Sequence, residues 1–574
     1  MAVEKLITEH IDTWTSALKT RSTAGRGSNG KIDLYGIKKL RELILELAVR
    51  GKLVPQDPND EPASELLKRI AAEKAELVKQ GKIKKQKPLP EISEHEKPFE
   101  LPVGWEWVRL GYICKKLTDG SHNPPKDNGS GYPMLSSQNI QNGQIDTDNP
   151  SRFVCEDGFN KENSRTLVQE GDVLLTIVGS LGRSAVVIND VKFVLQRSVA
   201  VLSSGLFPSY LSDYFKSITA QLYFIENGKG TAQKGIYLGQ LSQMLVPVPS
   251  LVEQERIVSK IHELMALCDQ LEQQSLTSLD AHQQLIETLL TTLTNSQNSE
   301  KLAENWARIS QCFDTLFTTE SSIDTLKQTI LQLAIMGKLV QQDPNDEPAS
   351  ELLKRIEQEK TQLVKEGKIK KQKPLPPISD DEKPFELPVG WEWCRFGSVI
   401  NIRAELVRPE NYYDLFQVAP DIIEKGTGKV LSRRTVKESG VKGPNSRFYK
   451  NQIVYSKIRP SLSKAFIAEY DGLCSADMYP LDCFLNAGYL LKVILSEVFL
   501  IQVRAAENRV KMPKLNVESL SSIIIPVPPV EIQSTVFNMI SHIDNFCDTL
   551  KARLQSAQQT QLHLADALTD AALN

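Results

Sequence analysis

The stretch Gly51-Lys-Leu-Val-Pro-Gln-Asp-Pro-Asn-Asp-Glu-Pro-Ala-Ser-Glu-Leu-Leu-Lys-Arg-Ile70 occurs twice in the chain. It recurs at Gly337–Ile356 with one change, Pro55 to Gln341, at an offset of 286 residues. A repeated segment of this length indicates a duplicated architecture. Two further segments recur at the same offset: Gly81–Pro90 as Gly367–Pro376, and Glu96–Trp107 as Glu382–Trp393.

Each copy of the repeat predicts two helices. Apolar residues at helical spacing share one face of a helix that ends before Gly51 or Gly337, and glycine favours such an end. A second helix begins at Ala63 or Ala349, just after a proline. The lysine-rich stretches behind these helices are interpreted as helix ends and linkers rather than DNA patches. The apolar positions of the first helix are Ile37, Leu40, Ile44, Leu47 and Ala48, which match Ile323, Leu326, Ile330, Leu333 and Ala334.

A second block is also duplicated. Val246–Pro249 matches Ile525–Pro528 at an offset of 279 residues, and a helix with an apolar seam follows each copy. Steps of four and three residues are typical of a helix that packs along another helix, and the matched registers favour a pairing of the two halves. The seam positions are Ile257, Ile261, Leu264, Cys268 and Leu271, then Val536, Ile540, Ile543, Cys547 and Leu550.

Between these blocks lie two inserts without a sustained match to each other, which we call the first domain (108–249) and the second domain (394–528). Short apolar runs at 172–178, 184–188 and 451–456 predict strands, and Gly, Asn, Asp and Pro punctuate both inserts. The fold class is therefore mixed α/β, with two strand-rich domains on long antiparallel helices and a pseudo-two-fold internal repeat. We call the duplicated segments outside the two inserts the frame. A preserved frame around different inserts suggests two different targets.

Composition narrows the class of protein. The formal net charge is −3, no apolar run approaches the ~18 residues of a membrane helix, and Met1–His10 lacks the apolar run of a signal peptide. We expect a soluble protein of the cytoplasm, without a membrane partner. No cysteine or histidine spacing indicates a metal site, so reduced thiols are expected. The eight cysteines are Cys114, Cys155, Cys268, Cys312, Cys394, Cys474, Cys483 and Cys547.

Two motifs carry a family resemblance. Leu101-Pro-Val-Gly-Trp-Glu-Trp-Val-Arg-Leu-Gly111 recurs as Leu387–Gly397. The exit segment Pro247-Val-Pro-Ser-Leu-Val-Glu-Gln-Glu-Arg-Ile257 recurs as Pro526–Gln533, in which Ile532 stands between Glu531 and Gln533. Together they resemble the specificity subunits of Type I restriction–modification enzymes over nearly the whole chain. The long segment before each domain resembles the Type IB branch.

The resemblance implies a non-catalytic subunit that reads a bipartite, asymmetric double-stranded DNA site, one half per target-recognition domain. Partner subunits then direct adenine methylation or restriction. It implies two methylation subunits, which carry S-adenosylmethionine, and restriction subunits, which use ATP and Mg²⁺; this chain itself would bind no cofactor. The expected segments are 1–107 (helical arm and linker), 108–249 (first domain), 250–295 (central spacer helix), 296–393 (second linker and arm), 394–528 (second domain) and 529–574 (distal spacer helix).

The spacer helices suggest how a bipartite site would be measured. A helix from Glu253 to about Leu293 would be about 60 Å long at ~1.5 Å per residue, against about 34 Å for a turn of DNA. Helix length would then fix the number of unread base pairs. Adding one helical turn to both helices should lengthen the spacer, and an unchanged spacer would contradict this expectation.

In the first domain, a polar loop near the start resembles the "TDGxH" loop of the family, and a Gly/Lys-rich segment lies near the exit. Asn and Gln can pair with adenine, and Arg or Lys with guanine, although turns and core hydrogen bonds use the same residues. The DNA-contact candidates are Lys116, Thr118, Asp119, Ser121, His122, Asn123, Ser137, Gln138, Asn139, Arg183, Thr231, Gln233, Lys234 and Tyr237.

The second domain contains a basic stripe. From Lys429 to Lys464 ten Lys or Arg residues stand against one acid, Glu438, with Tyr449 and Tyr455 interleaved. Such a stripe suits phosphate contact, whereas a solvated face is the structural alternative. The DNA-contact candidates are Arg403, Arg433, Arg434, Lys442, Arg447, Tyr455, Lys457, Arg459, Arg504, Asn508, Arg509 and Lys511.

The sequence motifs give little support for a catalytic role of this chain. Asn123-Pro-Pro-Lys126 resembles the N-P-P-aromatic motif of adenine methyltransferases, but Lys126 replaces the aromatic residue and no cofactor loop accompanies it. Gly426–Lys429 lacks the P-loop pattern. His122 beside Asp119 is better explained by a turn hydrogen bond than by acid–base chemistry. The remaining alternative is a coiled-coil scaffold that binds proteins and not DNA, which would have no need of the basic stripe.

Overall fold

The structure is a computed structural model that describes residues 3–21, 31–189, 192–230, 233–403, 405–506 and 513–573. It consists of two compact units. The first contains residues 1–278 and 557–574, and the second contains residues 279–556. Each half of the duplicated chain therefore folds around its own domain, as the repeat predicts.

The repeated segments form the predicted helices. In the first unit they are α3 (Tyr35–Val49) and α4 (Ala63–Lys79), and in the second α13 (Glu320–Ile335) and α14 (Ala349–Lys365). Gly51 and Gly337 have φ values of +66° and +72°, the left-handed conformation that glycine adopts without a Cβ clash. A Cβ at either position would also meet the ring of Pro102 or Pro388. The predicted stop residues are thus confirmed.

A half-buried lysine attaches each arm to its domain. Lys360 of α14 donates from Nζ to the carbonyl oxygens of Gly397, Ser398 and Ile400 at 2.7, 3.2 and 2.9 Å, and burial lowers its pKa to about 8. Lys74 of α4 makes the matching bonds in the first unit. Because one ammonium supplies three donors, a single lysine can bond several carbonyls at this junction.

The arginine of the repeated Trp-x-Trp-x-Arg motif is also structural. Arg109 and Arg395 are almost fully buried, and each forms an ion pair with the glutamate of the same repeat, Glu96 or Glu382. Hydrogen bonds from the Ser93 backbone and Arg109 lower the pKa of Glu96 to about 2. The motif therefore fixes the entrance of each domain and is not part of a binding surface.

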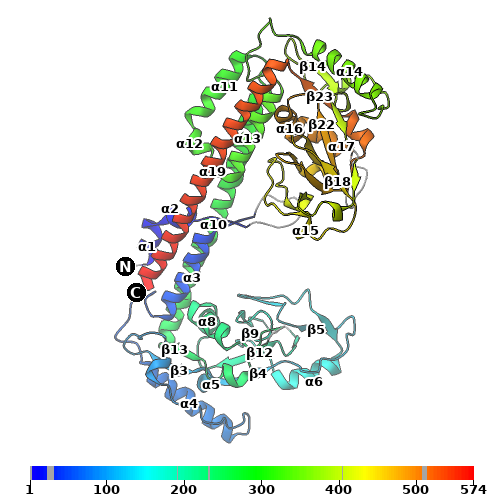
Figure 1. The fold of residues 1–574 in the computed structure, drawn as a ribbon. Helices are drawn as coiled ribbons and strands as arrows, with labels where there is room; N and C mark the ends of the chain where they lie inside the picture. Colours follow the sequence, from blue (N-terminus) through cyan, green and yellow to red (C-terminus); the bar gives the residue numbers. More distant parts are fainter. Residues whose placement is uncertain are drawn as a thin grey trace. The chain divides into compact units, whose positions relative to one another are not determined.

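Two 44-residue helices follow the domains, α10 (Leu251–Thr294) and α19 (Val530–Leu573) (Figure 1). α10 begins in the first unit and ends in the second, whereas α19 begins in the second and ends in the first. The seam residues of both helices are buried or partly buried. The seam of α19 shares cores with the second domain, with α13 and with the end of α10. The end of α10 and the seam of α19 thus belong to one core. The predicted pairing of helices from the two halves is confirmed within the second unit, where residues at the end of α10, and not its seam, pack against α19.

The first domain is built on a four-stranded antiparallel sheet of order β10-β9-β12-β4. The predicted strands at 172–178 and 184–188 are confirmed as β9 and β10. Helices α7 (Pro208–Lys216) and α8 (Ile218–Asn227) follow the sheet in the chain. The strands are β3 Glu106–Arg109, β4 Cys114–Asp119, β5 Tyr132–Leu135, β6 Ile140–Gln141, β7 Gln144–Ile145, β8 Arg152–Val154, β9 Val173–Thr176, β10 Ser184–Val186, β11 Val194–Leu195, β12 Val199–Ser204 and β13 Leu245–Val248.

The second domain repeats this sheet without repeating its sequence. Its order is β20-β19-β22-β15, also antiparallel throughout, and the predicted strand at 451–456 is β19. Helices α16 (Ala487–Leu495) and α17 (Glu497–Ala505) follow it. The strands are β14 Glu392–Arg395, β15 Ile400–Ile402, β16 Leu406–Val407, β17 Phe416–Val418, β18 Asn445–Phe448, β19 Ile453–Ser456, β20 Ala465–Ile467, β21 Gly472–Ser475, β22 Met478–Cys483 and β23 Ile524–Val527.

Short elements complete each unit. Trp14 of α2 is fully buried, and the backbone around it lies close to Gly36 of α3. None of the described helices is long and apolar enough to cross a membrane. The described residues also contain no cluster of three His, Cys, Asp or Glu side chains suited to a metal ion. The short helices and strands are α1 Val3–Glu9, α2 Ile11–Ser16, β1 Lys19–Arg21, β2 Lys31–Asp33, α5 Leu110–Ile113, α6 Glu156–Thr166, α9 Leu238–Leu241, α11 Ser299–Gln311, α12 Phe313–Leu316, α15 Val436–Ser439 and α18 Val517–Ser522.

Candidate nucleic-acid interface

The loops at one end of the first domain's sheet are tied together by backbone hydrogen bonds. After β9, Ile177 donates to the carbonyl of Ser198 at 2.9 Å, and Ile236 of the exit segment donates back to Ile177 at 2.9 Å. Gly179 donates to Lys234, also at 2.9 Å. We call this end of the sheet the loop edge of the first domain. It joins the turn before β12, the turn after β9 and the exit segment.

The second domain has the same bonds at the same end of its sheet. After β19, Lys457 donates to the carbonyl of Asp477 at 3.0 Å, and Leu515 donates to Lys457 at 2.9 Å. Arg459 donates to Pro513 at 2.9 Å. This is the loop edge of the second domain. Because the two edges share their hydrogen bonds and not their side chains, each can present different side chains from one backbone frame.

Most candidates of the first domain lie at or beside its loop edge. His122 Nε2 lies 2.8 Å from Oδ2 of Asp119, and Arg165 donates to Oδ1 of Asp119 at 2.7 Å. The predicted turn hydrogen bond of His122 is thus confirmed. Thr118 precedes Asp119, the last residue of β4. The other candidates placed at this edge are Ser121, Asn123, Ser137, Gln138, Arg183, Gln233, Lys234 and Tyr237, of which Tyr237 is 73% exposed.

Two candidates of the first domain are engaged internally. Lys116 Nζ bonds Oδ2 of buried Asp172 and the carbonyl of Leu167, both at 2.6 Å. The buried amide of Asn139 accepts from the backbone of Ser136 and donates to the carbonyl of Asn149. We therefore leave Lys116 and Asn139 out of the interface. Thr231 lies outside the described residues.

In the second domain, Lys457 and Arg459 occupy the loop edge. Arg459 has a φ of +45° and a ψ of +54°, the left-handed conformation. By its backbone hydrogen bond it corresponds to Gly179 of the first domain, whose φ is +84°. A non-glycine residue pays about 1–2 kcal/mol for this conformation. Strained residues cluster at functional sites, so an exposed arginine where the other domain has glycine indicates a role for its side chain.

A ladder of arginines and tyrosines lies near the start of β19, where the backbone of Tyr449 donates to the side chain of Gln452. Arg403 follows β15 and stacks over the ring of Tyr449 at 4.6 Å, while Arg447 lies between Tyr449 and Tyr412 at 4.9 and 5.2 Å. Burial, together with the hydrogen bond that its hydroxyl donates to Glu405, raises the pKa of Tyr449. Stacked guanidinium groups are held flat and pre-oriented, which suits phosphate or base contact.

The remaining candidates of the second domain differ in whether their side chains are free to contact DNA. Arg433, Arg434 and Arg504 each form an ion pair with a carboxylate of the second domain, and Lys442 is exposed. The structure corrects the sequence prediction at Tyr455, which is 1% exposed because it points from β19 into the core. Asn508, Arg509 and Lys511 lie outside the described residues.

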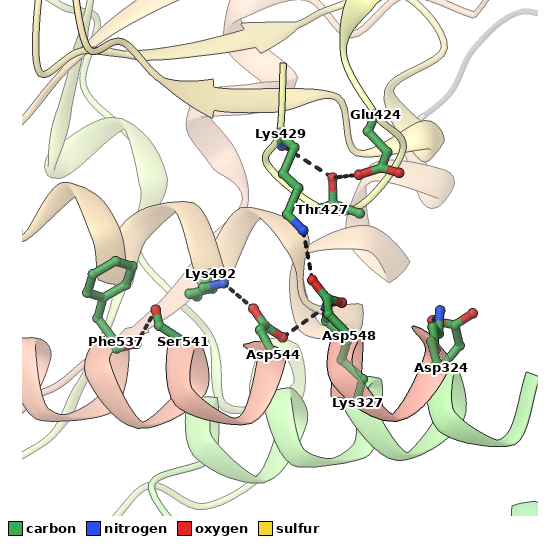
Figure 2. Close-up of polar contacts among 11 residues, drawn as sticks. Asp324, Lys327, Glu424, Thr427, Lys429, Lys492, Phe537, Ser541, Asp544 and Asp548 are labelled. Carbon is green, nitrogen blue, oxygen red and sulfur yellow. Dashed lines mark hydrogen bonds and ion pairs between the residues drawn. The ribbon is translucent and has the colours of Figure 1, made fainter. Parts of the chain in front are cut away.

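The basic stripe itself is not one surface. Lys464 Nζ bonds the carbonyl of Pro420, and Lys429 forms an ion pair with Asp548 of α19 at 2.8 Å (Figure 2). Sequence reasoning also missed the exposed Arg197, whose backbone bonds Ser121 at the loop edge. Arg197 lacks basic neighbours in the chain, so only the sheet topology could have identified it.

Comparison with known proteins agrees with this architecture of two domains in a duplicated frame. The model of the "Type I restriction modification DNA specificity domain" matches residues 102–281 and 388–559. The chain therefore belongs to the family of Type I restriction–modification DNA specificity subunits, which are not themselves catalytic. This membership sets aside the scaffold alternative.

Particular relatives are similar over their full length. The specificity subunits of the Type I restriction enzymes EcoEI and EcoAI of Escherichia coli are 50% and 48% identical to this chain, with 100% of both chains covered in each case. A solved structure described as "Structural basis underlying complex assembly andconformational transition of the type I R-M system" is 17% identical and covers 83% of this chain and 99% of its own, with a TM-score of 0.47.

Proposed function

We propose that each domain reads one half of a bipartite, asymmetric DNA site through its loop edge. The observation that carries this proposal is the identical set of backbone hydrogen bonds at the two edges, which display different side chains. Each edge would dock on DNA in a similar orientation, and the two sets of side chains would select different half-sites.

The side chains at the loop edges suit contacts both with phosphates and with bases. Lys457 and Arg459 in the second domain, and Arg183 and Lys234 in the first, offer cations for phosphates and guanines. Asn123 and Gln138 offer amides suited to adenine. Cations supply affinity that depends on salt, and base contacts supply the sequence preference.

We also propose the partners that this family membership implies. Two methylation subunits and the restriction subunits would assemble on this chain in the bacterial cytoplasm and would bring S-adenosylmethionine, ATP and Mg²⁺. The duplicated frame supports two equal attachments, since each repeat copy offers the same arm and helix surface. Adenine methylation in each half-site would then follow from one methylation subunit per domain.

Charge reversal in the second domain tests the DNA contact. In the complex with the methylation subunit, Lys457→Glu with Arg459→Glu should weaken duplex binding and flatten the slope of log affinity against log salt by about one unit per lost phosphate contact. The matched control is Lys437→Glu, an exposed lysine on α15 of the same domain. Equal effects of both changes would point to net charge alone and contradict the proposal.

A further inference from the structure

One face of α19 holds the second domain. Gln533 accepts a hydrogen bond from the backbone of Asn486 at 2.8 Å, just before α16. A Cβ on Gly488 of α16 would come within 2.7 Å of the ring of Phe537, so this helix lies close against α19. Farther along, Asp544 and Asp548 lie one turn apart. Positions 533, 537, 544 and 548 fall at spacings of four and seven residues, which places them on one side of a helix.

Three lysines from separate elements meet these two aspartates (Figure 2). Lys492 of α16 lies 2.5 Å from Oδ2 of Asp544, and Lys429 lies 2.8 Å from Oδ2 of Asp548. Lys327 of α13 lies 3.3 Å from both carboxylates. Lys327 and the two aspartates belong to the helices, whereas Lys429 and Lys492 belong to the second domain.

The two domain lysines are presented by ordered backbone. Lys492 is 10% exposed, because its neighbours Tyr489, Leu490 and Val493 fill the core beneath the sheet. Lys429 ends a tight turn in which Thr427 donates to Glu424 and accepts from the backbone of Lys429. Removing one partner of a pair as buried as Lys492–Asp544 destabilises a protein strongly, because the other charge stays buried without its partner. The more exposed Lys429–Asp548 pair contributes less free energy and adds a second point at which the domain is fixed to α19.

The first unit attaches its domain differently. Arg41 and Asp269 occupy the positions of Lys327 and Asp548 and form the same helix–helix pair at 2.7 Å. Position 213, which corresponds to Lys492, is an aspartate that pairs with Lys216 of its own helix. The first domain is held instead by Glu46 of α3, which accepts from the hydroxyl and the backbone N–H of Thr219 at 2.6 and 3.0 Å. The lysine attachment is thus a property of the second domain and not of the shared frame.

We propose that Lys429 and Lys492 are positioning residues, which fix the second domain on α19 and set the direction in which Lys457 and Arg459 face DNA without touching DNA themselves. This role rests on the function proposed above for the loop edge. Lys429 stands within the basic stripe of the sequence, yet its partner is a helix.

A distance measurement in the full-length chain tests the attachment without DNA. Nitroxide labels at Lys437→Cys on the second domain and Ala552→Cys on α19, with exposed Cys155 and Cys312 changed to serine, report the distribution of distances between them by pulsed electron paramagnetic resonance. Lys429→Met with Lys492→Met should broaden or shift this distribution, and arginine at both positions should retain it. The control Lys551→Met breaks an α19 pair with Asp324 that does not involve the domain. A distribution unchanged from the wild type would overturn the proposal.

DNA binding then separates positioning from contact. The double methionine variant should bind its target duplex about tenfold more weakly with an unchanged slope against salt, because no phosphate contact is lost. A slope flattened by about two units would show that these lysines touch phosphates and would overturn the proposal. If the wild-type complex shows no preference for any duplex, the proposed function fails, while the distance measurement still decides the attachment.

Discussion

Lys338 donates from Nζ to the carbonyl oxygen of Thr294, the last residue of α10, at 2.7 Å. The same position of the other repeat copy, Lys52, donates to the carbonyl oxygen of Leu573, the last residue of α19, also at 2.7 Å. A cation at the C-terminus of a helix is stabilised by the helix dipole and satisfies carbonyls that lack intrahelical partners. Each repeat copy thus caps one long helix, which explains why this lysine stands in both copies.

Removal of this cap should destabilise the second unit. Lys338→Met leaves the carbonyls of Thr294 and Ser296 without their charged donor, and we expect a loss of about 1 kcal/mol in the free energy of unfolding. Chemical denaturation of the full-length chain measures the change. Lys301→Met, which removes an exposed lysine paired with Glu304 one turn away, is the control and should change little. Equal losses in the two variants would contradict the capping role.

A buried glutamate gives the first unit a pH-dependent stability. Glu253 in the first turn of α10 is 3% exposed, and burial raises its pKa from the ordinary value of 4.5, against hydrogen bonds from Gln56 and Trp105. Because the folded-state pKa lies above the unfolded one, the stabilisation is fully present below pH 4.5 and is lost as pH rises through the folded-state value. At neutral pH the charged carboxylate therefore costs stability.

The matching position of the second unit indicates which residue should replace Glu253 to remove this cost. Ile532 stands at the matching position of α19, and Trp391 there bonds Gln342 alone at 2.7 Å. Glu253→Ile should raise the free energy of unfolding at pH 8 by about 1 kcal/mol, with a smaller gain at pH 4.5, as melting temperatures across this range would show. Glu255→Gln, an exposed change on the same helix, should show no such trend. A gain that does not depend on pH would argue against the carboxylate as the cause.

The left-handed Arg459 should separate stability from DNA binding. Arg459→Gly removes about 1–2 kcal/mol of backbone strain, which offsets the lost side-chain contacts and the flexibility of glycine, so the melting temperature should stay level or rise. Affinity for the target duplex should fall about tenfold or more if the guanidinium contacts a base or phosphate.

Ser463 provides a control in the same turn. Its φ is +46°, and its side chain is buried, so Ser463→Gly relieves comparable strain without removing a group that could reach DNA. Its affinity for DNA should remain that of the wild type. If both glycine variants lose affinity equally, the shape of the turn matters and the arginine side chain does not.

The frame could be predicted from sequence because its signals are local and written twice. Gly51 and Gly337 mark helix ends, Ala63 and Ala349 follow a proline at a helix start, and the apolar steps of α10 and α19 predict two long helices. The partners of the seams could not be predicted in this way. A 4-3 pattern shows that a helix is buried on one side and does not show which surface covers it.

The equivalence of the two domains was hidden from sequence for a physical reason. The bonds that define each loop edge, such as those from Ile236 to Ile177 and from Leu515 to Lys457, join backbone groups that every residue carries. Side chains at these positions are free to differ, so no motif survives. The sequence likewise assigned Lys429 to the basic stripe, because its partner Asp548 lies 119 residues away.

The central claim, that each loop edge reads its own half-site, is tested most directly by sequencing the modified adenines of a host that co-expresses this chain and its methylation subunit. The wild type should give one bipartite motif with a modified adenine in each half, and Arg459→Gly should relax or abolish the preference in one half while the other half stays unchanged. A motif that is not bipartite, or a variant that alters both halves equally, would contradict the account.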